Sequence, residues 1–231
     1  AADRRATEEL IPYALSDRPA YRMAFARVMA SVQDSTALPE LEKLLTDPIP
    51  YVRLAAAFAV GQISSTSSLP ALDKALKKAT IPEIKAEMLE AVGKCADARA
   101  MEFLVYHDPN TADEEVGKMY GIYRGTLRGL LKKEYLRTVV AHLSSGVAET
   151  RLMAAHVLAR QKGLDLQPFC NVIADRAVND EEGEIRLAAM QALRHCRRPV
   201  YPAKTSAEQD PDPRVRSAAI ALLPTKGKDR E

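Results

Sequence analysis

Apolar residues recur along this chain at the spacing of amphipathic α-helices, and turns containing Asp or Pro interrupt the pattern at short intervals. In residues 38–45, leucines stand at positions 38, 41, 44 and 45, which places them on one side of a helix. Asp47 and Pro48 then end this segment, and Pro50 opens a second helix that runs to about Ile63. The pattern therefore predicts short helices arranged in antiparallel pairs.

The two-helix unit is repeated. Each copy has a turn, an aliphatic or aromatic residue, a basic residue and then an Ala-rich helix, as in residues 47–57 and 210–219. The basic marker residues lie 30–35 residues apart, at Arg22, Arg53, Lys85, Lys118, Arg151, Arg186 and Arg216. Neither helix of a pair can bury its apolar side alone, whereas stacked pairs build a continuous core. We predict an all-α fold, an α-solenoid of about seven antiparallel helix pairs over residues 1–224, followed by a polar tail at 225–231.

The acidic and basic residues of the repeat have a structural explanation. Asp is favoured near a helix N-terminus, and an Arg one turn into the second helix can reach a carboxylate of the adjacent unit. We therefore expect a structural ladder, with no catalytic role, for the seven basic markers and for Asp17, Asp47 and Asp210.

The composition narrows the classes of partner. With 33 basic and 31 acidic residues the formal charge is only +2, so no global field attracts nucleic acid or an anionic membrane. The longest apolar stretches, such as residues 54–60, are far shorter than the roughly 20 residues of a membrane-spanning helix. We expect no membrane span.

The three cysteines are an odd number, and all fall on predicted helices. They are Cys95, Cys170 and Cys196. We expect buried thiols and no disulfide.

The residues that carry catalysis or bind metals are scattered. No two of the four histidines lie within ten residues of each other, so no helix presents a metal-binding pair. His195 and Cys196 are adjacent, but adjacent helical residues point about 100° apart and form a poor catalytic dyad. The acidic runs 113–115 and 180–182 precede second helices, where negative charge complements the helix dipole. We expect no enzyme activity, no metal and no cofactor.

One segment departs from the plain repeat because glycine recurs at every fourth position. The positions are Gly117, Gly121, Gly125 and Gly129. In a helix each glycine costs about 1 kcal/mol relative to Ala, so some contact should offset the loss. The contact is either a closely packed neighbouring helix or a partner that lies against the glycines. In the second case the partner-binding residues are the flanking Tyr120, Tyr123, Arg124 and Arg128, of types enriched at interface hot spots.

The repeat register resembles the HEAT-repeat superfamily, in particular its short PBS-lyase-like version. Four segments within the first hundred or so residues are similar to the N-terminal HEAT region of bacterial proteins that carry a cyclophilin-type peptidyl-prolyl isomerase domain further on. These segments are residues 3–5, 21–22, 30–34 and 57–63. The resemblance implies the HEAT array of an exported, multidomain folding factor, hence a periplasmic location, with the cytoplasm as the alternative. No stretch of this chain resembles the isomerase active-site strand with its Phe-His-Arg pattern, so we expect no isomerase activity from the chain itself.

These observations predict a binding module in which the second helices line a surface that holds a protein or peptide partner. The alternative is a nucleic-acid-binding HEAT-like protein, which would use the local basic patch from Lys118 to Arg137. The near-neutral charge and the absence of Trp weigh against it. A third possibility, chromophore attachment by a lyase, rests on the family name alone.

Overall fold

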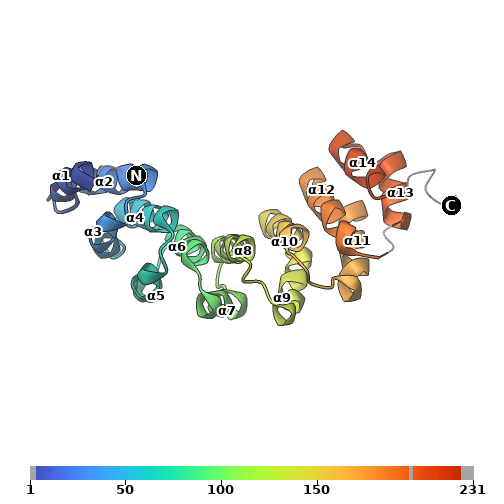
Figure 1. Cartoon of the computed structure of the whole chain (residues 1–231), viewed down its shortest axis with the longest axis horizontal. Helices are drawn as coiled ribbons and strands as arrows, with labels where there is room; N and C mark the ends of the chain where they lie inside the picture. The colour runs from blue at the N-terminus through green and yellow to red at the C-terminus, as the bar shows by residue number, and fades with distance from the viewer. Residues whose placement is uncertain (1–3, 198–199, 225–231) are drawn as a thin grey trace. The chain divides into compact units, whose positions relative to one another are not determined.

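A computed structural model describes residues 4–197 and 200–224, and the predicted tail at 225–231 lies outside the described residues. The described chain is helical throughout, and the prediction of seven antiparallel helix pairs is confirmed (Figure 1). The pairs are α1 (Arg4–Ala14) with α2 (Pro19–Val32), α3 (Leu38–Leu44) with α4 (Pro50–Ile63), α5 (Leu69–Lys78) with α6 (Pro82–Cys95), α7 (Ala98–Tyr106) with α8 (Ala112–Leu127), α9 (Leu136–Ala141) with α10 (Ala148–Arg160), α11 (Cys170–Asn179) with α12 (Gly183–Ala192), and α13 (Val200–Gln209) with α14 (Pro213–Ile220). Short 3-10 turns flank several helices: η1 (Ser35–Ala37), η2 (Thr66–Ser68), η3 (Lys133–Tyr135), η4 (His142–Ser144), η5 (Gln167–Phe169) and η6 (Leu193–His195).

The helices form two compact units, Ala1–Leu130 and Leu131–Glu231, which we call unit 1 and unit 2. In unit 1 the second helices α2, α4, α6 and α8 pack side by side in chain order. The first helices α3, α5 and α7 lie on one side of this row (Figure 1). Unit 1 is therefore a two-layered stack of helix pairs. In unit 2 the same stacking joins α10 to α12 and α12 to α14.

Proline and the residue before it define where the second helices begin. Pro50 and Pro82 stand in the first turn of α4 and α6, where the missing N–H leaves no bond unmade. Ile49 and Ile81 before them are extended, as the proline ring requires. α4 ends at Ile63, and the capping residue Ser64 adopts a left-handed conformation (φ 55°) and donates its N–H to the carbonyl of Val60. Local sequence thus determines where α4 and α6 begin and where α4 ends.

The expectation that Cys170 and Cys196 are free thiols is wrong, because they form a disulfide. Cys170 begins α11, and Cys196 directly follows the 3-10 turn at the end of α12. Antiparallel pairing of these helices brings the two Cα atoms to 6.0 Å, a separation that a disulfide can bridge. An odd cysteine count leaves room for one pair, and only the folded chain shows which two residues meet. Cys95 is buried and free.

Within the described ranges, no helix has both the length and the apolar character that crossing a bilayer demands.

Candidate binding surfaces

The predicted ladder begins on α2 with an ion pair between successive repeats. Arg22 donates from Nε and Nη2 to the two carboxylate oxygens of Asp47, at 2.7 and 3.0 Å, and from Nη1 to the carbonyl of Ser16 at 2.8 Å. Asp47 also accepts from the N–H of Ile49 at 2.9 Å. Burial by itself would raise the pKa of Asp47, but the bonds from Arg22 and Ile49 and the nearby positive charges lower it overall. The carboxylate is therefore ionised at neutral pH and joins one helix pair to the next.

The same arrangement recurs in unit 2. Arg151 donates to both oxygens of Asp180, at 2.9 and 3.1 Å, and to the carbonyl of Ser145 at 3.0 Å. Arg186 donates to both oxygens of Asp210, at 2.8 and 3.0 Å, and to the carbonyl of Asp180 at 2.9 Å. Each of these arginines thus bonds a carbonyl in the turn that precedes its own helix and a carboxylate in the corresponding turn of the next helix pair. Such bidentate pairs have a defined geometry that fixes how the repeats stack.

The third and fourth basic markers use lysine and a different geometry. Lys85 donates to Oε1 of Glu114 at 2.9 Å, and Glu114 is only 2% exposed at the start of α8. Lys118 is buried as well, and its Nζ donates to the carbonyl of His107 at 2.7 Å. His107 has a lowered pKa, chiefly because of burial, so it is neutral at pH 7. The polar cluster of Lys85, His107, Glu114 and Lys118 therefore lies between the third and fourth helix pairs.

The sequence interpretation assigned the acidic runs to the helix dipole and missed Glu114 and Asp180 as ladder carboxylates. One signal could have found Asp180: it stands six residues before a basic marker, as Asp47 and Asp210 do. Glu114 stands only four residues before Lys118, so this spacing could not have revealed it.

Besides Lys118, three predicted ladder residues make no ion pair of this kind in the described chain. Arg53 donates to the carbonyls of Asp47 and Pro48, at 2.7 and 3.1 Å, since the third repeat has Ala79 at the position where three of the repeats have Asp. Arg216 likewise bonds the carbonyls of Asp210 and Pro211, at 2.8 and 3.1 Å. Asp17 is exposed and acts on Arg22 only through its charge, because the ladder position in the first turn belongs to the preceding Ser16.

Close helix packing, and not a partner, occupies the glycine positions of α8. A Cβ at Gly117 would collide with the backbone of Ala86 on α6, and one at Gly121 would lie 2.5 Å from the carbonyl oxygen of Leu89. A Cβ at Gly125 would lie 2.5 Å from Sδ of Met101 on α7. Gly129 differs, because it follows the helix with φ +78° and has nothing near its Cβ position. The interpretation that a partner lies against the glycines is therefore wrong.

The four flanking residues that the sequence proposed for partner binding remain at the surface or half-buried. Arg124 donates from Nε and Nη2 to Oε1 of Glu90 on α6, at 3.0 and 2.8 Å, and its guanidinium lies 5.9 Å from the ring centre of Tyr123. Arg128 is exposed and donates to the carbonyl of Lys94 at 2.9 Å. Tyr120 and Tyr123 are half-buried. The structure thus ties both arginines of this set to α6.

The network continues across α6 to α4. Lys94 Nζ lies 3.1 Å from Oε1 of Glu90 and 5.2 Å from the ring centre of Phe58. A chain of contacts therefore runs from Phe58 through Lys94 and Glu90 to Arg124 and Tyr123. These contacts join side chains of the second helices α4, α6 and α8 at one surface.

The α4 face beside this network is apolar and exposed. Tyr51, Leu54 and Phe58 have exposed fractions of 47%, 39% and 42%. Their spacing of three and four residues places them on one side of the helix. These three residues were not among the predicted binding residues, although large apolar side chains at helical spacing within an Ala-rich segment are a signal that the sequence contains.

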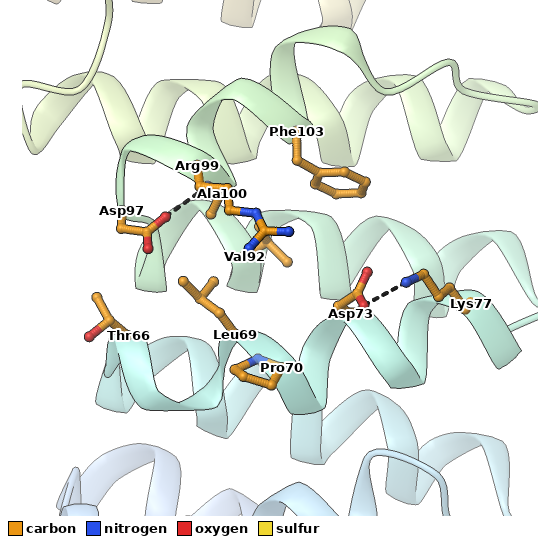
Figure 2. A pocket seen from close by; sticks show the side chains of 10 residues that line it. All are labelled: Thr66, Leu69, Pro70, Asp73, Lys77, Val92, Asp97, Arg99, Ala100 and Phe103. Carbon is orange, nitrogen blue, oxygen red and sulfur yellow. Dashed lines mark hydrogen bonds and ion pairs between the residues drawn. The ribbon is translucent and has the colours of Figure 1, made fainter.

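A groove of about 490 Å³ opens between the first helices α5 and α7 (Figure 2). Val92 of α6 lies at its base, Leu69 and Pro70 line the α5 side, and Arg99 and Phe103 line the α7 side. Its volume falls in the range of ligand-binding pockets.

The described residues contain no cluster of three or more His, Cys, Asp or Glu side chains that could hold a metal ion. The free thiol of Cys95 is buried, and burial raises its pKa to about 11. Such a thiol is a poor nucleophile at neutral pH.

Stacked antiparallel helix pairs of this kind define the α-solenoid class of helical-repeat proteins. Residues 7–93 and 44–116 match the family profile of HEAT repeats, so the helix pairs in this part of the chain are HEAT repeats. A search of curated protein sequences finds no significant match.

Solved structures show the same fold at low sequence identity. An engineered protein superposes with a TM-score of 0.55 and 18% identity over 82% of this chain and 96% of its own. A second engineered protein gives a TM-score of 0.55 and 16% identity over 92% of this chain and 66% of its own. The complex of CpcE and CpcF of phycocyanin lyase from Nostoc sp. PCC7120 gives a TM-score of 0.52 and 20% identity, covering 96% of this chain and 84% of the matched chain. These similarities show the fold alone, a stack of antiparallel helix pairs.

Proposed function

We propose that this chain is a protein-interaction scaffold that binds a protein or peptide partner across α4, α6 and α8 of unit 1. The observation that supports the proposal best is the exposed apolar stripe of Tyr51, Leu54 and Phe58 on α4. Aromatic side chains grouped on one exposed helix face are typical of interaction sites, since the free protein gains nothing by leaving them in water.

The surroundings of the stripe favour a preformed surface. Phe58, Lys94, Glu90, Arg124 and Tyr123 restrain one another through the contacts described above. Side chains that are already ordered lose less conformational entropy when a partner binds. Tyr and Arg are also the residue types that contribute most to binding energy at interfaces.

Glu87 of α6 adds a polar feature to this surface. Its Oε1 is buried and accepts no hydrogen bond from the described residues. Burial, with the neighbouring charge of Glu90, raises the pKa of Glu87. Because this oxygen is closed to solvent, a donor on the partner would satisfy it only after the Glu87 side chain turns outward.

The proposal is tested with variants that alter the surface and leave the core intact. The tagged full chain would be cross-linked to proteins of a native extract, and the captured partner would be identified by mass spectrometry. The partner would then be purified, and the Kd of its complex with the chain would be measured. We expect Tyr51→Ala combined with Phe58→Ala to weaken binding by roughly tenfold or more, because truncated hot-spot residues commonly cost over 1.4 kcal/mol.

Tyr201→Ala serves as the matched control, since Tyr201 is 82% exposed on α13, outside the proposed surface. Equal Kd values for the double variant and the control would refute the proposed surface.

Nucleic-acid binding through the basic patch has less support. Lys118 is buried on the carbonyl of His107, Arg124 is paired with Glu90, and Arg128 bonds the carbonyl of Lys94. Cations that are already bonded have to give up those contacts to reach phosphates. DNA binding by the chain with an affinity that falls steeply with salt would reverse this preference.

We further propose, from the resemblance of the first hundred residues, that the scaffold positions client proteins for an isomerase domain in an extracytoplasmic compartment. The disulfide between Cys170 and Cys196 supports this location, because such bonds persist mainly in oxidising compartments. Fractionation of the native cells followed by immunodetection tests it, and recovery with cytoplasmic markers only would contradict it.

A further inference from the structure

We propose a second binding site, independent of the surface above, in the groove between α5 and α7. It would hold an extended acidic peptide segment of a partner, with a carboxylate on Arg99 and an adjacent apolar side chain between Leu69 and Phe103. The site belongs to the layer of first helices, whereas the proposed scaffold surface belongs to the second helices (Figure 1).

The groove lining carries two acidic and two basic side chains, and they differ in whether they already have a partner. Asp73 is paired with Lys77 at 2.7 Å, and Asp97 accepts the N–H of Ala100 at 2.8 Å at the start of α7. Arg99 extends from α7 over the groove towards Val92, as Figure 2 shows, and makes no hydrogen bond or ion pair with any described residue. Since Lys77 is paired with Asp73 and Asp97 caps α7, Arg99 is the charged group of the lining that has no partner among the described residues, and its fork of N–H donors matches a carboxylate.

The apolar lining specifies what should accompany the carboxylate. Phe103 is 39% exposed on the α7 side of the groove, and Leu69 and Pro70 line the α5 side (Figure 2). Burying a Leu or Phe side chain between these surfaces removes apolar area from water on both sides. The groove therefore fits an acidic residue next to a large apolar one.

The open rim favours a peptide over a small molecule. The side chains of Lys77 and Asp73 are 73% and 52% exposed, so one wall of the groove is formed by solvated groups. Sites for small ligands commonly enclose most of the ligand surface, which this groove cannot do. A peptide needs only one face of its chain to be covered, and its neighbouring residues can lie along the helices.

The test uses the full chain, ¹⁵N-labelled, titrated by NMR with a capped Gly-Leu-Asp-Leu-Gly peptide and with its Asn counterpart. We expect shifts at residues of α5 and α7, and an affinity for the Asp peptide roughly tenfold higher than for the Asn peptide, as loss of a charge-assisted bond predicts. Arg99→Gln should abolish this difference, and Arg99→Glu should favour a Lys peptide. Arg137→Gln, at an exposed arginine on α9, is the control and should change nothing.

Each alternative result overturns the proposal. Equal affinities for the Asp and Asn peptides would exclude recognition of the carboxylate. Shifts caused by 4-phenylbutyrate but by neither peptide would assign the groove to a small amphiphilic acid. Absence of shifts at α5 and α7 with millimolar peptide would exclude the site, while leaving the scaffold surface on the second helices unaffected.

Discussion

For the arginine markers, the ladder between repeats depends on the residue six positions before the basic marker of the next repeat. Where this residue is Asp, as at Asp47, Asp180 and Asp210, its carboxylate accepts two bonds from the arginine of the preceding repeat. Where it is Ala79, Arg53 bonds carbonyls alone. A single side chain thus decides whether an ion pair links two adjacent pairs of helices.

Removing one partner of such a pair should therefore be costly. In Asp47→Ala the largely buried Arg22 loses its counter-charge, and we expect the free energy of unfolding to fall by about 3 kcal/mol. Asp17→Ala, at an exposed aspartate of the first turn, should change it by less than about 0.5 kcal/mol. Urea unfolding followed by circular dichroism compares the two, and coincident unfolding curves would show that the ion pair adds no stability.

At the scale of elements, α6 and α8 approach so closely because glycine lies on both sides of their contact. Gly93 of α6 faces Gly121 of α8, and a Cβ on Gly93 would collide with the Gly121 backbone. The packing gained by this approach offsets the low helix propensity of glycine. The glycines that looked like a binding feature in the sequence are a packing feature of the core.

Adding one methyl group to a glycine at this contact tests whether close packing explains the glycines. Gly121→Ala should lower the free energy of unfolding by about 1–3 kcal/mol through overpacking, even though Ala is the better helix former. Its Cβ would lie 2.5 Å from the carbonyl oxygen of Leu89 and 3.1 Å from both methyl groups of Leu104.

Gly146→Ala is the matched control, since nothing lies within 4 Å of the Cβ position there. Thermal unfolding by calorimetry measures both variants. A Gly121→Ala protein as stable as the control would mean that α6 can move aside at little cost.

At the scale of the whole molecule, the two units differ in how they are held together. Unit 1 is stabilised by non-covalent packing and by ion pairs such as that of Arg22 with Asp47. Unit 2 has ion pairs of the same kind and also the disulfide that links the two ends of its middle helix pair. Reducing conditions should therefore act on unit 2 selectively.

We expect reduction to lower the stability of unit 2 by about 3 kcal/mol, the loss predicted by loop-closure entropy for a bridge between residues 26 positions apart. Hydrogen exchange with and without reductant should show loss of protection in described segments of unit 2 and unchanged protection in unit 1. Equal loss of protection in both units would contradict the expectation that the disulfide stabilises unit 2 alone. Alkylation before and after reduction, read by mass spectrometry, verifies that Cys170 and Cys196 are the residues released.

The sequence by itself determined the repeat, the bounds of the helix from Pro50 to Ile63 and the positions of the basic marker residues. These features are local: helical periodicity, proline in the first turn and the spacing of Asp and Arg follow from interactions between residues close in the chain. The same reasoning indicated that Tyr123 and Arg124 lie in one region, although not that Glu90 of the preceding pair binds the arginine.

Only the tertiary structure decided which distant residues meet. It paired Cys170 with Cys196, placed Glu114 under Lys85 and filled the glycine positions of α8 with α6. It also opened the groove between α5 and α7, whose lining comes from segments about 30 residues apart. Such contacts depend on how the helix pairs stack, and stacking is the sum of many small packing terms that no single motif in the chain encodes.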